Sequence, residues 1–152
     1  MIRNAESIKS KIAEFFGRSV SKVTSLAYIF EHGEPDPIEI QIWFMHQFVG
    51  VGCSSDGESI LITDSISKEV YMDEFGELKI VNVSSQQPYS NLVSMNLIDC
   101  ELWKNEYEII CGVEFVFDSD ARIILFNLGD DLRVFTETPA FFADEGYSRI
   151  LK

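Results

Sequence analysis

Acidic and aromatic side chains lie close together in one short stretch of this sequence, between residues 103 and 108. Trp and Tyr are rigid binding anchors, and carboxylates form charge-assisted hydrogen bonds with Arg or Lys of another protein. Two further acidic groups lie in sequences typical of turns. We therefore predict a partner-binding surface made of Trp103, Glu106, Tyr107, Glu108, Asp118, Asp120, Asp130 and Asp131. The competing interpretation is that Trp103 packs against a neighbouring layer and the acids form an ordinary solvated rim.

Nucleophilic catalysis requires a base beside a Ser or Cys, and the only histidines are His32 and His46. Both lie in turn-like sequences, and no Gly-x-Ser-x-Gly elbow is present. Glycoside hydrolysis requires two carboxylates held across a cleft, and nothing in the sequence singles out such a pair. We expect no catalytic residues and no cofactor, and we keep a carboxylate- or metal-dependent enzyme as the second alternative.

A metal site is conceivable in residues 31–36, where Glu31, His32, Glu34 and Asp36 supply oxygen and nitrogen ligands. Pro35 restricts that loop, and the turns at 118–120 and 130–131 lack the EF-hand pattern. We therefore expect no bound metal. The three cysteines, Cys53, Cys100 and Cys111, have no zinc-site spacing, and we expect them to be thiols in a cytoplasmic protein.

Charge is unevenly distributed along the chain. Residues 1–22 hold five bases and two acids, a net charge of +3, whereas residues 23–152 hold seven bases and 23 acids, a net charge of −16. Such a negative field repels nucleic acid and anionic lipid and attracts basic proteins. We expect a protein partner, no nucleic acid and no membrane association. A second explanation, that the acidity serves only solubility, stays open.

The elements that must position these residues begin with a predicted amphipathic helix over residues 4–17. Its apolar stripe consists of Ile8, Ile12, Phe15 and Phe16, and Gly17 lies where a helix C-cap belongs. Short segments rich in Val, Ile, Phe and Tyr follow, with turn residues between them, which is typical of antiparallel strands. They are 23–31, 38–45, 48–54, 59–63, 69–72, 78–83, 97–104, 109–117, 122–127, 131–136 and 147–151.

These patterns predict a single α+β domain over residues 1–152. The helix would precede a β half at 23–83, a connecting segment at 84–96 and a second β half at 97–151. The two halves share landmarks in the same order, so we predict a duplicated four-stranded meander. The matched segments are 38–43 with 98–103, Gly50-Val51 with Gly112-Val113, Asp56 with Asp118, 60–62 with 123–125, and 76–80 with 129–134.

The hairpin at 97–117 allows a register prediction. A two-residue turn at Asn105-Glu106 would place three apolar pairs on one face: Leu102 with Ile109, Cys100 with Cys111, and Ile98 with Val113. The opposite face would then be acidic around the Trp103 indole. In this register Cys100 and Cys111 come close enough to bridge, although we expect them to stay reduced.

In size, acidity and strand content, the whole chain resembles the immunity proteins of bacterial contact-dependent and polymorphic toxin systems. That resemblance implies a small cytoplasmic protein that binds a basic toxin domain stoichiometrically and blocks it. No diagnostic motif accompanies it, so no site residue is carried over from the family. The first alternative is a structural or regulatory module that self-associates, for example as a homodimer, through exposed sheet.

Overall fold

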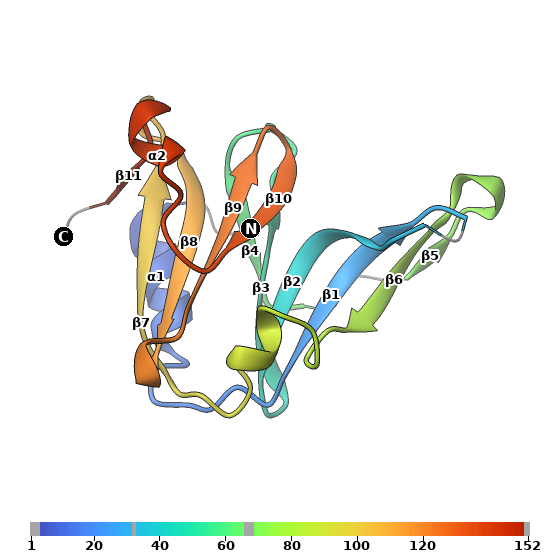
Figure 1. The fold of residues 1–152 in the computed structure, drawn as a ribbon, viewed down its shortest axis with the longest axis horizontal. Helices are drawn as coiled ribbons and strands as arrows, with labels where there is room; N and C mark the ends of the chain where they lie inside the picture. The colour runs from blue at the N-terminus through green and yellow to red at the C-terminus, as the bar shows by residue number, and fades with distance from the viewer. Residues whose placement is uncertain (1–3, 32, 66–68, 151–152) are drawn as a thin grey trace.

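The computed structural model describes residues 4–31, 33–65 and 69–150, which form two antiparallel β-sheets that pack face to face (Figure 1). The first sheet has the order β4-β3-β2-β1-β6-β5, and the second has the order β10-β9-β8-β7-β11. The first contains β1 (Lys22–Ile29), β2 (Asp36–Phe44), β3 (Gln47–Cys53), β4 (Ile60–Thr63), β5 (Val70–Tyr71) and β6 (Glu77–Asn82). The second contains β7 (Leu97–Lys104), β8 (Ile110–Phe117), β9 (Arg122–Leu128), β10 (Asp131–Phe135) and β11 (Ser148–Arg149).

The predicted strands are confirmed, with ends that shift by two residues or fewer in the part of the chain that the structure describes. Residues 84–96 connect the two sheets and carry the short helix η2 (Tyr89–Asn91). Helix is scarce, at 15% of the chain, so the fold is mainly antiparallel β and the α+β description applies only weakly. The other short helices are η1 (Asp73–Phe75), η3 (Asp118–Asp120) and α2 (Phe141–Asp144).

The N-terminal helix α1 (Ala5–Ala13) is shorter than predicted. Asn4 caps it by accepting a hydrogen bond from the Ser7 amide at 2.8 Å. Ile8, Ile12 and Phe15 are buried as the stripe predicted, whereas Phe16 remains 38% exposed. Its C-cap is Glu14, so the predicted C-cap at Gly17 is wrong. Residues 14–17 form turns, and at Gly17, where φ is +84°, the amide donates to the Leu97 carbonyl.

The two sheets are offset. β4 packs over β8, β3 over β9, and β2 over β10, while α1 packs against β7. The helix therefore fills the space beside β4, where the first sheet ends. On the other side, β1, β6 and β5 extend past β10 as a projecting arm (Figure 1). Both sheets and α1 contribute to one main core, in which Ile40, Ile42, Val113 and Phe115 are fully buried.

The predicted register of the 97–117 hairpin is wrong. Leu102 pairs with Val113 and Cys100 pairs with Phe115, a shift of four residues from the expected partners. The turn is longer than two residues, because the Asn105 side chain accepts hydrogen bonds from the Tyr107 and Ile109 amides. Lys104 pairs with Ile110, so the longer turn shifts the register by three residues, and a bulge between Trp103 and Lys104 adds the fourth; a second bulge lies between Leu97 and Asp99.

These bulges also separate the two cysteines that the predicted register would have brought together. Cys100 lies in the main core, whereas Cys111 belongs to a second apolar cluster with Trp103, Phe126 and Phe142. The described cysteines are thiols rather than disulfides. Among the described residues, no helix has both the length and the apolar character needed to cross a membrane.

Candidate functional site

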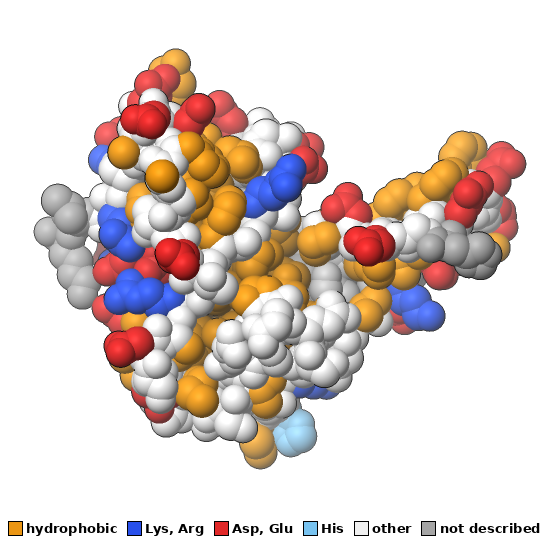
Figure 2. Space-filling model, in the orientation of Figure 1, with side chains coloured by type: hydrophobic (Ala, Val, Ile, Leu, Met, Phe, Trp, Pro, Cys, Tyr) orange, Lys and Arg blue, Asp and Glu red, His pale blue; other side chains and the backbone are white. Residues whose placement is uncertain are grey.

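Three hairpin turns and α2 meet at one end of the sandwich (Figure 1). They are the β3–β4, β7–β8 and β9–β10 turns, and each carries carboxylates because polar residues occupy exposed turn positions. We call this surface the acidic end. It comprises Asp56, Glu58, Glu106, Glu108, Asp130, Asp131, Asp144 and Glu145. Figure 2 shows Asp and Glu side chains gathered at this end and a second group at the tip of the arm.

A shallow hollow of about 330 Å³ joins the turns of the acidic end. Its lining includes Glu58 from the β3–β4 turn of the first sheet and Asn105 from the β7–β8 turn of the second sheet. Tyr147, between α2 and β11, also lines it. The two sheets are tied together here, because the Asn127 amide donates to the Ser59 carbonyl at 2.9 Å. The relative placement of the three turns is therefore set by buried structure and not by the turns themselves.

Electrostatic effects at the acidic end come from both sheets. A hydrogen bond with Glu106 and the charge of that carboxylate raise the pKa of Tyr107, and Glu58 acts in the same direction from the facing sheet. Burial raises the pKa of the Cys53 thiol to about 11, with a further contribution from Asp130 and Asp131. Tyr107 is therefore under the influence of carboxylates from both sheets.

Two basic side chains lie within the same turns. Lys104 binds Glu108 at 2.6 Å, and Arg133 lies 3.5 Å from Asp131. Among the described residues, the ion pairs with Lys and Arg do not involve Glu58, Glu106, Asp130, Asp144 or Glu145. Two cations beside eight carboxylates leave the acidic end strongly negative. Exposed ion pairs of this kind also contribute little to the stability of the turns.

The structure brings together five of the predicted binding residues: Glu106, Tyr107, Glu108, Asp130 and Asp131. Tyr107 is 72% exposed, so its ring is available as an anchor. The sequence prediction missed four members of the acidic end: Asp56, Glu58, Asp144 and Glu145. Their turn-like surroundings were visible in the sequence, but their placement at the same end as Glu106 depends on how the two sheets pack.

Trp103 is not part of the exposed surface, which corrects its place in the predicted site. Only 4% of its surface is exposed, because Phe142 of α2 covers its ring at a centroid distance of 4.9 Å. The Arg149 guanidinium lies over the same ring at 4.7 Å. The competing interpretation of Trp103, packing against a neighbouring layer, is the one that the structure confirms.

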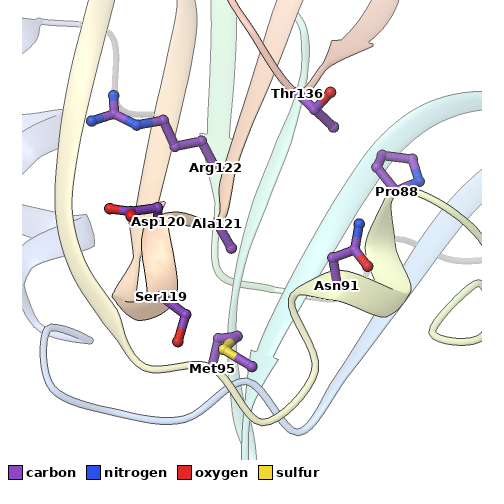
Figure 3. A pocket seen from close by; sticks show the side chains of 8 residues that line it. All are labelled: Pro88, Asn91, Met95, Ser119, Asp120, Ala121, Arg122 and Thr136. Atoms are coloured by element: carbon purple, nitrogen blue, oxygen red, sulfur yellow. The ribbon is translucent and has the colours of Figure 1, made fainter.

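Asp118 and Asp120 lie at the opposite end of the sandwich, in the β8–β9 turn, and so are not joined to the other predicted residues. Asp118 has a structural role, since it accepts hydrogen bonds from the Asn96 backbone and side-chain amides at 3.0 Å. Asp120 lines a hollow of about 420 Å³ together with Arg122. Figure 3 shows that both charged side chains point away from the neutral residues around this hollow.

A buried ion-pair network on the outer face of the second sheet was also missed. Glu114 is 1% exposed and accepts hydrogen bonds from Arg122 at 2.5 Å, from Arg149 at 3.2 Å and from the Trp103 indole at 3.1 Å. Glu101 binds Arg149 at 2.6 Å. A buried carboxylate needs such partners, and the network attaches β11 to β7 and β8. We assign it a structural role because all of its charges are internally paired.

No group of three or more His, Cys, Asp or Glu side chains is placed to hold a metal ion within residues 4–31, 33–65 and 69–150. His32, part of the conceivable metal site in the 31–36 loop, lies outside the described residues. His46 lies in the β2–β3 turn, beside Lys11 and Asp64 in a separate small hollow.

No protein-family model, curated protein or solved structure matches the chain. The candidate site is therefore argued from its own geometry and charge.

Proposed function

We propose that this protein is a non-catalytic binding protein that captures a basic protein partner with its acidic end. The observation that carries the proposal is that three turns of two different sheets and the α2 segment place eight carboxylates at one end of the molecule, where Glu58 lines a shallow hollow. An immunity-type role, in which the partner is a cognate toxin domain, is the specific form of this proposal that we favour.

The physical basis is electrostatic steering followed by docking. A concentrated negative field speeds the encounter with a cationic surface, and the carboxylates then pair with Arg or Lys side chains of the partner. Tyr107 is exposed beside Glu106 in this field and provides an apolar contact. Because the turns stand on packed sheets, the surface is preorganised and loses little conformational freedom on binding.

A matched pair of charge-reversal variants tests the proposal. Glu58→Lys with Glu106→Lys alters the acidic end, and Glu14→Lys with Glu137→Lys makes the same change in net charge elsewhere. All four side chains are exposed and none lies in the left-handed region. The tagged wild-type protein is used to isolate its partner from the source cells at low salt, and the affinity of each variant for that partner is then measured by calorimetry.

We expect a basic partner whose affinity falls at least tenfold in the acidic-end variant and less than threefold in the control variant. The wild-type affinity should also fall as salt rises, because exposed charges are screened. Equal losses in the two variants would show that only net charge matters. An acidic partner, or an unchanged affinity in the acidic-end variant, would overturn the choice of surface. A growth assay with the partner expressed alone or with this protein tests the immunity role.

A second candidate function, self-association, is favoured by the arm. Tyr71 and Phe75 are 74% and 66% exposed near the edge strand β5, and Phe30 is 48% exposed. Exposed aromatic groups beside an unpaired edge are typical of protein contacts. Sedimentation equilibrium distinguishes the two functions: a stable dimer that Tyr71→Ser and Phe75→Ser dissociate would support self-association.

We also propose that the two sheets derive from a duplicated unit. β2–β3–β4 and β7–β8–β9 are consecutive meanders, with Trp43 and Trp103 near the end of the first strand of each. The last pair of landmarks, 76–80 with 129–134, is placed differently, because β6 pairs with β1 whereas β10 pairs with β9. The proposed repeat therefore extends over three strands.

A further inference from the structure

A hollow of about 400 Å³ lies at the root of the arm, away from the acidic end. Its floor is made by Ser25 and Ala27 of β1 and by Val81 of β6, and its sides by Pro35 and Tyr89, with Glu34 also lining it. The volume is within the range of about 300–1,000 Å³ that is usual for small-molecule sites.

The hollow follows from side-chain size and from the offset between the sheets. Ser25 pairs directly with Val81, so their side chains share one face of the sheet. That face also carries Ala27, and these small side chains leave space above the strands. Because the arm extends past β10, the second sheet does not fill the space (Figure 1). Tyr89 of the connecting segment is buried beside it.

The Ser25 hydroxyl, independently of the hollow itself, also points to a ligand. Its side chain is buried, with 4% of the residue exposed, and its hydroxyl oxygen has no hydrogen-bond partner. An unsatisfied buried hydroxyl destabilises a folded protein by about 1–3 kcal/mol, so such groups are uncommon without a reason. Ser25 lines the hollow, where a bound molecule would supply the missing partner.

Charge restricts the class of that molecule. Among the described residues that line the hollow, Glu34 is the single charged one and none is basic. The chain as a whole carries a formal charge of −13. An anion would therefore be repelled, whereas a cationic group would pair with the Glu34 carboxylate. The flat sheet floor and the Pro35 and Tyr89 rings suit a flat apolar body.

We propose that this hollow binds a small organic cation with a flat apolar body. In this arrangement the cationic group donates to Glu34 and to the Ser25 hydroxyl, and the apolar body lies on Ala27 and Val81. The proposal goes beyond the proposed function, because it uses different residues and a different class of ligand from the acidic end.

Benzamidine is a suitable probe, because it joins a flat ring to a cationic hydrogen-bond donor. Benzamide has the same shape without the charge, and benzoate carries the opposite charge. Each is titrated into the ¹⁵N-labelled full-length protein, and amide chemical shifts give both the affinity and the location. We expect saturable benzamidine binding, with the largest amide shifts at Ser25, Val81 and Tyr89. The affinity for benzamidine should be at least fivefold higher than that for benzamide, and benzoate should not bind.

Three single variants follow. Ser25→Ala removes the hydroxyl and should weaken benzamidine binding about three- to tenfold, the loss expected for one hydrogen bond. Glu34→Gln should reduce the preference for benzamidine over benzamide to less than twofold. Ser54→Ala is the matched control, because Ser54 is another buried serine whose hydroxyl has no hydrogen-bond partner, and it does not line this hollow. It should leave the affinity unchanged.

The proposal is overturned if the amide shifts are not saturated by benzamidine below 10 mM. A Kd of 10 mM corresponds to a binding free energy of about 2.7 kcal/mol. It is also overturned if the shifts map to the acidic end, or if benzamide and benzamidine bind equally. Shift mapping on the wild-type protein decides the location even if a variant fails to fold.

Discussion

Glu114→Gln is the most informative single change for the stability of the second sheet. Glu114 is 1% exposed, and its carboxylate is held by Arg122 at 2.5 Å and by Arg149 at 3.2 Å. The substitution preserves size but removes the negative charge that the two guanidinium groups share, and it leaves one acceptor oxygen where there were two. Gln also presents an amide group that donates, toward neighbours that already donate.

Removing one partner of a fully buried ion pair costs about 3–5 kcal/mol. The Arg122 and Arg149 side chains are 43% and 39% exposed, so water screens part of the resulting charge imbalance. We therefore expect a loss of about 2–3 kcal/mol in the free energy of unfolding, which is roughly 4–12 °C in Tm for a chain of this size.

Urea unfolding followed by tryptophan fluorescence measures this loss, because the Trp103 indole donates to Glu114. Glu101→Gln is the control: that side chain is 36% exposed, and the loss should be less than about 1 kcal/mol. If the Glu114 variant lost as little as the Glu101 variant, the network would not attach β11 to the sheet as we argue.

Two further predictions follow from burial. Phe142→Ala should lower the free energy of unfolding by about 3–5 kcal/mol, because the ring is 1% exposed and covers Trp103. Phe141→Ala removes an exposed ring and should lower it by less than about 1 kcal/mol. Thermal unfolding of the two variants compares these losses. Cys53, with its pKa raised from 9.0 to about 11, holds about 100-fold less thiolate at pH 8 than an ordinary thiol. The greater nucleophilicity of its thiolate offsets about tenfold of this difference, so Cys53 should be alkylated about tenfold more slowly than an ordinary thiol. Peptide mass mapping identifies the alkylated cysteine. Its rate should rise until about pH 11, and a plateau below pH 9 would contradict the shift.

The sequence alone was sufficient to locate the strands. Alternating apolar residues and turn clusters are local signals, and they located the strands because most strands bury a face against a common core. The stripe of Ile8, Ile12 and Phe15 was visible for the same reason. The excess of acid in turn-like segments was also readable, because turns are exposed wherever the strands lie.

Register, layer packing and proximity were decided by the tertiary structure. The 97–117 hairpin depends on two bulges and on the Asn105 side chain, which shift the pairing without changing the apolar pattern that sequence reasoning uses. Trp103 is buried by Phe142, which is distant in sequence and belongs to a helix of four residues that no periodicity signals. Glu58 and Glu106 meet because two sheets pack face to face, and packing depends on the shapes of whole layers. A local sequence pattern contains no information about which layers will face each other.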